Sequence, residues 1–123
     1  SGGQKFWSWY GFESRVEWCA CFASWCAEQS GMVASGQVLK FSSCAVGASW
    51  FQGQGRWKGK GYTPSAGDFI FFDWNKDGQV DHVGIVVKVA NGRVNTIEGN
   101  TSNMVARRSY QLGGIVIVGY GYI

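Results

Sequence analysis

The sequence predicts an α+β domain in which N-terminal helices pack on an antiparallel β-sheet of about five to six strands. Two observations carry this prediction. Apolar residues recur at helical spacing in the first part of the chain, and from Gly67 onward they alternate or form short β-branched and aromatic runs between turns. No repeat or linker interrupts this order, so we interpret residues 1–123 as a single domain and expect it to be part of a longer parent chain.

Composition excludes several classes of protein. With 46% hydrophobic and 16% aromatic residues, the chain is neither disordered nor a linker. Its formal charge of +3 fits an anionic partner, but no basic stripe interleaves with the aromatic residues, so we expect no nucleic-acid binding. No apolar run approaches the length that spans a membrane, which predicts a domain that is not membrane-embedded. We expect a monomer.

The stretch Arg15–Gly31 is predicted to be an amphipathic helix, beside which the aromatic segment Phe6–Gly11 packs. Ser14 followed three residues later by Glu17 has the spacing of a capping box, and Gly31 is a plausible stop.

Cys19 therefore lies near the N-terminal end of this helix, where backbone N–H groups and the helix dipole favour a thiolate. The alternative is a buried cysteine that acts only as a small hydrophobe. The capping box itself conflicts with the reactive interpretation, because it would place Cys19 beyond the first turn, where the dipole effect has faded.

Cys21 and Cys26 follow Cys19 on the same helix, and only Cys44 lies elsewhere. None of these spacings reads as a zinc ribbon. A disulfide between Cys44 and one of the helix cysteines stays open, and so does the redox compartment.

A short second helix is expected over residues 43–51. The segment Gln52–Gly61 is rich in glycine and basic residues, which predicts a mobile loop. Either it is a wall of a groove that contacts substrate through Arg56, Trp57 and Lys58, or, as composition favours, it is only a solvated loop.

The second half of the chain is predicted to be strands joined by short turns. The expected ranges are residues 68–72, 82–89, 93–98, 105–110 and 115–122.

The one histidine, His82, opens the second of these strands, and Glu98 and Asn100 end the next. A two-residue turn at Asn91-Gly92 would pair His82 with Thr101 and point both Glu98 and Asn100 to the opposite face. A three-residue turn would pair His82 with Asn100 and bring Glu98 to the same face. A joint site requires that turn or a compensating bulge, and the local sequence permits either turn.

In the second register the residues suit nucleophilic chemistry. Cys19 supplies a thiolate, His82 acts as base and then acid, and either Asn100 or Glu98 orients the imidazole. The backbone N–H of Cys19 is the natural oxyanion donor. This set predicts acyl transfer through a thioester.

Three ordered motifs resemble one family across nearly the whole chain. They are W-C-A-C-F-A-S-W-C, then G-D-F-I-F-F-D-W-N-x-D-G-x-x-D-H-V-G-I-V, then I-E-G-N. Together they are similar to the CHAP family, the cysteine- and histidine-dependent amidohydrolases/peptidases, which are papain-like enzymes that cut bacterial peptidoglycan.

The resemblance implies a papain-like fold, Cys19 as nucleophile and His82 as base, with Glu98 as the orienting third member and Asn100 assisting. The register instead prefers Asn100 directly opposite His82, so these two roles stay open. Papain-like enzymes often use a glutamine six residues before the cysteine as a side-chain oxyanion donor, and here that position is Glu13. That donor is therefore unassigned.

The chain has seven tryptophans, which predicts that some aromatic side chains line a groove for a ring-rich or glycan substrate. The predicted substrate-binding residues are Tyr10, Trp18, Trp57 and Trp74.

The segment 73–81 resembles the first part of a calcium loop, D-x-N-x-D-G. Its predicted ligands are Asp73, Asn75, Asp77 and Asp81. The twelfth position is Gly84 rather than the usual bidentate Glu, and the alternative is an Asx-rich turn that only positions His82. No cofactor is expected to be required.

These features predict a hydrolase of an amide or peptide bond in peptidoglycan, working outside the cell or in the cell wall. It would be a phage lysin domain, a remodelling enzyme or an antibacterial effector. The muramoyl-alanine amidase and endopeptidase activities use the same chemistry and stay unresolved. The rival hypotheses are a non-catalytic wall-binding module of the same fold and a thiol amidase acting on other amides.

Overall fold

The computed structural model describes residues 2–123, so Ser1 lies outside the described residues. Within that range three helices come first, namely α1 (Gln4–Tyr10), α2 (Cys19–Gln29) and α3 (Cys44–Gly53). Six strands follow: β1 (Trp57–Gly59), β2 (Phe69–Phe72), β3 (His82–Ala90), β4 (Arg93–Thr101), β5 (Met104–Gln111) and β6 (Ile117–Gly121). They form one antiparallel sheet in the order β1-β6-β2-β3-β4-β5. The predicted α+β class is confirmed.

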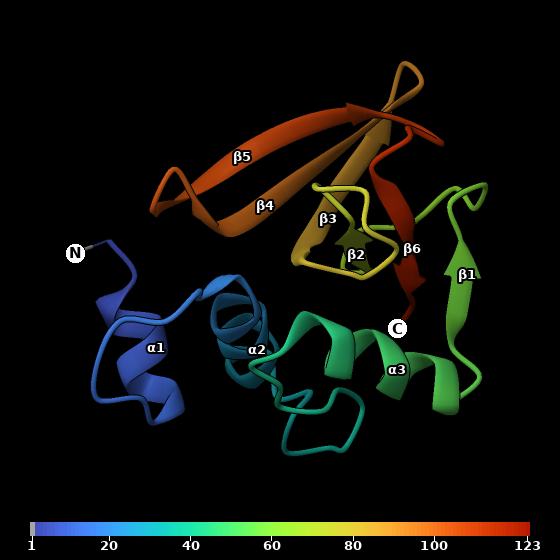
Figure 1. Cartoon of the computed structure of the whole chain (residues 1–123). Coiled ribbons are helices and arrows are strands. Elements are labelled where there is room, and N and C mark those ends of the chain that lie inside the picture. The colour runs from blue at the N-terminus through green and yellow to red at the C-terminus, as the bar shows by residue number, and fades with distance from the viewer. Residues whose placement is uncertain (1) are drawn as a thin grey trace.

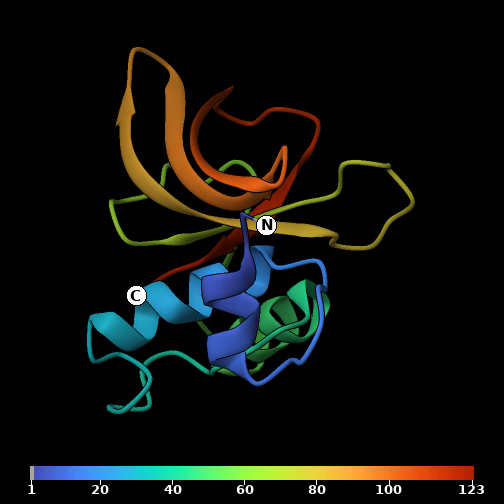
Figure 2. The same ribbon diagram turned by 90° about the vertical axis from the view of Figure 1, so that its left-hand side faces the viewer.

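The helices lie together on one side of the sheet, and β4 and β5 bend over its other side (Figures 1 and 2). Strand β2 is buried on both faces. Phe69 and Phe71 pack with α2 and α3, whereas Ile70 and Phe72 pack on the opposite face. This double burial explains why the F-I-F-F run is continuously apolar rather than alternating.

Helix α2 begins at Cys19, later than a capping box at Ser14 would have it. Trp18 is the N-cap and supplies no side-chain cap. The carboxylate of Glu17 instead accepts hydrogen bonds from Arg15 (2.9 Å) and from the Asn100 amide (2.8 Å). The predicted capping box is wrong, because a tertiary contact engages its acidic partner. Cys19 is therefore the first helical residue.

The predicted helix over residues 43–51 is confirmed as α3, where the Ser43 hydroxyl accepts from the backbone N–H of Val46. No helix among residues 2–123 combines the length and the apolar character that crossing a membrane requires.

The structure has an edge strand within residues 52–61, where the sequence predicted a mobile loop. Residues Trp57–Gly59 pair with β6 as an edge strand, and the indole of Trp57 packs on Phe71 with ring centroids 5.5 Å apart. Arg56 anchors the segment by donating to the backbone carbonyls of Tyr122 and Gln37. A three-residue strand is too short for a periodic signal, which is why composition misled the prediction.

The β3–β4 hairpin settles the register. Its turn is the two-residue type, because Ala90 pairs directly with Arg93. The register then shifts by one residue between Val86 and Lys88, so that Ile85 faces Ile97. This bulge restores the alignment in which the Gly84 and Glu98 positions meet. A joint site required either a three-residue turn or a compensating bulge, and this chain has the bulge.

Candidate active site

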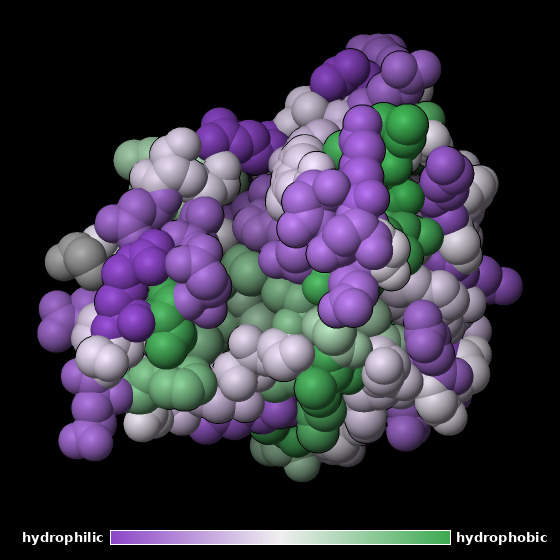
Figure 3. Space-filling model, viewed as in Figure 1, coloured by the Kyte–Doolittle hydropathy of each residue, from purple (hydrophilic) through white to green (hydrophobic). Residues whose placement is uncertain are grey.

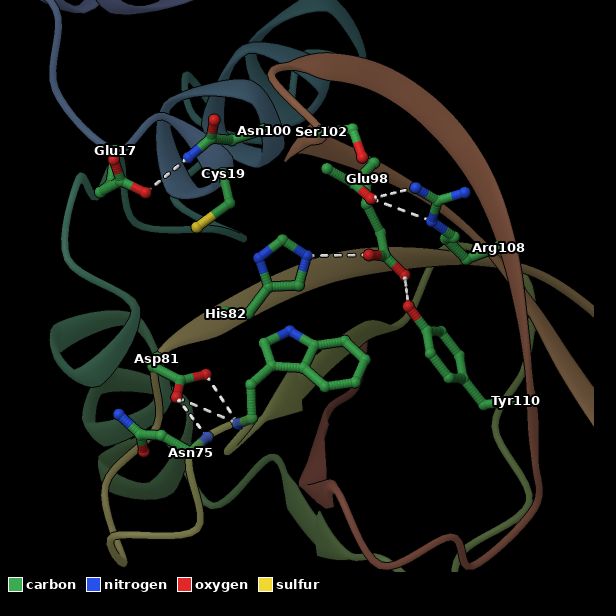
Figure 4. Close-up of a pocket in the computed structure, with 12 residues that line it drawn as sticks. Glu17, Cys19, Asn75, Asp81, His82, Glu98, Asn100, Ser102, Arg108 and Tyr110 are labelled. Carbon is green, nitrogen blue, oxygen red and sulfur yellow. Dashed lines mark hydrogen bonds and ion pairs between the residues drawn. The ribbon is translucent and has the colours of Figure 1, made fainter.

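Four elements meet at one pocket of about 590 Å³. Cys19 comes from the N-terminus of α2, His82 from the start of β3, Glu98 from β4 and Tyr110 from β5 (Figure 4). The face of the molecule seen in Figure 3 is hollowed near its middle, with apolar residues set back between hydrophilic ones. The sequence motifs that lie far apart along the chain therefore line the same cavity.

The His82 imidazole is held from behind by Glu98. Its Nε2 lies 2.8 Å from Glu98 Oε1. The other carboxylate oxygen of Glu98 accepts hydrogen bonds from the hydroxyls of Thr96 and Tyr110, the latter at 2.7 Å. Glu98 is only 1% exposed. Burial raises the pKa of Glu98, but the hydrogen bonds from His82, Thr96 and Tyr110 outweigh it and lower that pKa. Glu98 is thus a buried, ionised and fully partnered carboxylate.

Gly84 makes this contact sterically feasible. A Cβ atom built on Gly84 would lie 2.6 Å from Cγ of Glu98. Any larger residue at this position would therefore push Glu98 away from the imidazole.

The Cys19 sulfur lies where several groups favour its ionised form. It is 3.3 Å from the sulfur of Cys44, and His82 and the backbone N–H of Val83 also act on it and favour the thiolate. The Cys44 hydrogen bond, with His82 and Val83, overcomes burial and lowers the pKa of Cys19 to about 5. Its position as the first residue of α2 adds the helix dipole.

His82 shifts in the opposite direction. Burial lowers the pKa of His82, but hydrogen bonds and charges from Cys19 and Glu98 outweigh it and raise that pKa to about 9. Because Nε2 is bound to Glu98, Nδ1 is the nitrogen left for the sulfur, and the ring lies between the two partners (Figure 4). Both shifts favour the same form of the pair, a thiolate on Cys19 and an imidazolium on His82.

Asn100 lines the same pocket but belongs to its rim. Its amide donates to Glu17 and accepts from Arg15 at 2.9 Å. Asn100 has a φ of 60°, and the β4–β5 pairing is irregular between Glu98 and Thr101. This local distortion turns the Asn100 side chain toward the loop before α2. The preference for Asn100 directly opposite His82 is wrong in geometry, because Glu98 makes the contact.

The four predicted substrate-binding aromatics are not brought together. Trp74 lines the pocket, stacks on Phe72 and is 43% exposed. Trp18 is fully buried against Phe6, and its indole N–H donates to Asn103.

The other two aromatics lie away from the pocket. Tyr10 donates its hydroxyl to the Lys40 carbonyl and lies under the Lys40 ammonium, and Trp57 is packed beside β6. Trp18, Tyr10 and Trp57 are therefore corrected to structural positions, and Trp74 alone stays a candidate for substrate contact.

The segment 73–81 is not a cation cage. Asp73 accepts from the backbone N–H groups of Asp77 and Gly78, and Asp77 accepts from that of Gln79. Among residues 2–123 no group of three or more His, Cys, Asp or Glu side chains is arranged to hold a metal ion.

Asp81 binds the backbone N–H groups of Trp74 and Asn75. The calcium prediction is therefore corrected, because its ligands are not arranged as a metal site: Asp73, Asn75, Asp77 and Asp81. The alternative prediction, an Asx-rich turn, describes the loop that leads into His82.

Sequence reasoning missed three side chains of the site. Thr96 and Tyr110 back the Glu98 carboxylate, and Cys44 touches Cys19. Thr96 was within reach, because strand alternation places it on the same face as Glu98. Tyr110 and Cys44 require the β4–β5 register and the packing of α3 against α2, neither of which sequence spacing supplies. In this structure no disulfide links Cys44 to a cysteine of α2, because all four cysteines are free thiols.

Comparison with known proteins now decides the family. A model of the CHAP domain matches residues 9–100, a range that contains Cys19, His82, Glu98 and Asn100. The chain belongs to the CHAP domain family. A search of curated proteins found no match.

Two solved structures resemble this CHAP domain in fold. One is Ly7917 with the hydrolysing product of MDP, with a TM-score of 0.58 and 20% sequence identity over 83% of this chain and 52% of that chain. The other is Ly7917 itself, with a TM-score of 0.57 and 21% identity over 83% of this chain and 51% of that one. The CHAP domain thus spans about half the length of these proteins, and at this identity the likeness concerns the fold.

Proposed function

We propose that this CHAP domain is a peptidoglycan hydrolase that cleaves an amide bond by nucleophilic catalysis at Cys19. CHAP domains form a family of peptidoglycan hydrolases, and the fold neighbour Ly7917 was solved with the hydrolysing product of MDP. The single observation that carries the proposal is that Cys19 and His82 lie side by side in one pocket, where Glu98 holds the imidazole from behind. A wall-binding module has no need of a thiol and an imidazole held in this way.

The first half-reaction forms a thioester. The Cys19 thiolate attacks the carbonyl carbon of the scissile amide, and the carbonyl oxygen becomes an oxyanion. The backbone N–H of Cys19 is unclaimed within α2, because the first N–H groups of a helix lack intrahelical acceptors, and it faces this charge. The His82 imidazolium then donates its proton to the leaving nitrogen as the C–N bond breaks.

The second half-reaction hydrolyses the thioester. Neutral His82 takes a proton from water, the hydroxide attacks the acyl carbon, and the thiolate leaves, which regenerates the ion pair. Glu98 keeps the imidazole in one orientation through both steps and stabilises its positive charge. The proposed chemistry uses groups of the protein itself, and it takes place in the cell wall or outside the cell, where the substrate lies.

Digestion of purified peptidoglycan by the wild-type domain and by Cys19→Ala tests the proposal, with mass spectrometry of the released fragments. Free stem peptides that begin with L-Ala mean an amidase, whereas cut stems or bridges mean an endopeptidase. MDP and simple amino-acid amides serve as companion substrates. Absence of any Cys19-dependent fragment from several wall types, with retained sedimentation on the walls, would favour the binding module. Cleavage of simple amides alone would favour a thiol amidase on other substrates.

A further inference from the structure

Cys44 touches the Cys19 sulfur but has no role in the proposed mechanism. The two sulfur atoms are 3.3 Å apart, and both side chains are buried. Each cysteine is the first residue of its helix, Cys19 in α2 and Cys44 in α3, so the packing of the two helix N-termini fixes their approach. Cys21 and Cys26 belong instead to the aromatic cluster around Phe6 and Trp18.

We propose that Cys44 is a second functional thiol of this site, which donates its S–H to the Cys19 thiolate in the reduced protein and joins Cys19 in a disulfide when a hydroperoxide is present. This inference rests on the proposed function only for the catalytic value of the thiolate. The chemistry of the two thiols holds whatever the substrate is.

The donor role follows from the difference between the two sulfurs. The hydrogen bond with Cys19, with burial, raises the pKa of Cys44, and the same hydrogen bond lowers that of Cys19. The contact alone allows either sulfur to be the donor, but His82 and the backbone N–H of Val83 act on Cys19 and not on Cys44. The thiolate is therefore assigned to Cys19 and the S–H donor to Cys44. The other titratable groups that act on the pair are His82 from β3, Asp81 immediately before it, and Cys21 on α2.

The oxidised form requires little movement. A disulfide has an S–S length of about 2.0 Å, so the sulfurs need to approach by about 1.3 Å. The Cys19 thiolate attacks one oxygen of the hydroperoxide and becomes a sulfenic acid, while the O–O bond breaks and the other oxygen takes a proton from the His82 imidazolium and leaves as water or an alcohol. Cys44 then attacks the Cys19 sulfur, gives up its proton, and releases the sulfenic oxygen as water. Two thiols are oxidised and one peroxide is reduced.

Thiol chemistry read by mass spectrometry tests both roles without any substrate. The variants are Cys44→Ser, which keeps a hydroxyl donor but forms no disulfide, Cys44→Ala, which removes the donor, and Cys26→Ala as a matched control on α2. Thermal melts establish that each variant is folded. Iodoacetamide labelling of Cys19 is followed from about pH 4 to pH 10, and hydrogen peroxide treatment is followed by peptide mapping.

We expect the midpoint of Cys19 labelling to rise by about one pH unit or more in Cys44→Ala and by less in Cys44→Ser, and to stay unchanged in Cys26→Ala. Peroxide should link Cys19 to Cys44 in the wild type, with a loss of about 2 Da that dithiothreitol reverses. In Cys44→Ser, Cys19 should gain oxygen instead.

The proposal is overturned if Cys44→Ala labels like the wild type, or if peroxide adds oxygen to wild-type Cys19 without a link to Cys44. These outcomes are independent of peptidoglycan cleavage. If the domain shows the Cys44-dependent labelling and disulfide but releases no peptidoglycan fragment, the proposed function is contradicted and the inference about the two thiols stands.

Discussion

The two sides of Gly99 differ sharply, although Glu98 and Asn100 look like equal candidates in the sequence. Glu98 points inward, where it is 1% exposed and bonded to His82, Thr96 and Tyr110. Asn100 points to the rim, between Arg15 and Glu17, whose side chains are 42% and 79% exposed.

The difference in burial between Glu98 and Asn100 shows which contacts stabilise the orientation of the His82 imidazole. Buried hydrogen bonds to a charge are each worth about 1.5–3 kcal/mol, whereas exposed ion pairs contribute about 0–1 kcal/mol. The interior side therefore fixes His82, and the rim shapes the entrance to the pocket. Substitutions on the interior side should therefore affect hydrolysis more than substitutions at the rim.

His82→Ala should lower kcat/KM by about 10⁴-fold or more, because it removes the general base, the general acid and the partner of the thiolate at once. The Cys19 labelling midpoint should rise in the same variant, since the charge of His82 helps to lower the pKa of Cys19. Steady-state hydrolysis and iodoacetamide labelling measure the two effects. Activity within tenfold of wild type would remove His82 from the mechanism.

Glu98→Gln should slow hydrolysis by roughly 10²- to 10⁴-fold, because the amide is uncharged and stabilises the imidazolium less well. The high-pH limb of the rate profile should move down from about 9, since Glu98 contributes to the raised pKa of His82. The limb moves to lower pH because His82 must be protonated to act as the general acid, and with the uncharged glutamine beside it His82 loses its proton at a lower pH. A profile with an unmoved alkaline limb would contradict the account.

Gly84→Ala should destabilise the fold and weaken hydrolysis together, because the new methyl group would contact Glu98. Overpacking of this kind typically costs about 1–3 kcal/mol. Denaturant unfolding and hydrolysis assays, with Gly53→Ala as a control at a glycine that has open space around it, measure this. Equal stability of the two variants would mean that Glu98 is less confined than its contacts indicate.

Tyr110→Phe should reduce kcat/KM by about tenfold with an intact fold, since it deletes one hydrogen bond to the Glu98 carboxylate and keeps the ring that packs on Phe72 and Trp74. The pKa of Glu98 should rise, because a donor to its charged form is lost. If the variant affects only stability and leaves the pH profile unchanged, Tyr110 is a packing residue.

Asn100→Ala should have the smallest effect on kcat, about threefold or less, because its partners are exposed. KM is the parameter expected to change, since Asn100 and Glu17 line the pocket. A loss in kcat as large as that of Glu98→Gln would reverse the division between interior and rim.

The sequence predicted the fold class, the helix with Cys19 and the five main strands, and it named Cys19, His82 and Glu98, which the structure brings together, because these depend on periodicity and on motif order. It misplaced the start of α2 because Glu17 binds Asn100, 83 positions away, instead of capping the helix. It left Glu98 and Asn100 unresolved because one bulge on β3 and one left-handed residue on β4 decide which of them faces His82. Such single-residue irregularities leave no periodic trace.

Cys44 shows the other limit of sequence reasoning. Its contact with Cys19 arises from two helix N-termini that meet, and no spacing rule predicts a contact between cysteines 25 positions apart. By contrast, the Asx-rich turn before His82 was one of two alternatives that local sequence offered, and the backbone hydrogen bonds of Asp73 and Asp81 decide between them.

In the proposed mechanism the Cys19 thiolate and the His82 imidazolium form an ion pair, and Glu98 holds the imidazolium from its other side. Because His82 is the only histidine of the chain, its imidazole signals in an NMR titration are unambiguous. The account predicts that His82 stays protonated to about pH 9 in the wild type and that its pKa falls in Cys19→Ala, where the thiolate is gone. A wild-type pKa near the ordinary value of about 6.5, unchanged by Cys19→Ala, would contradict it.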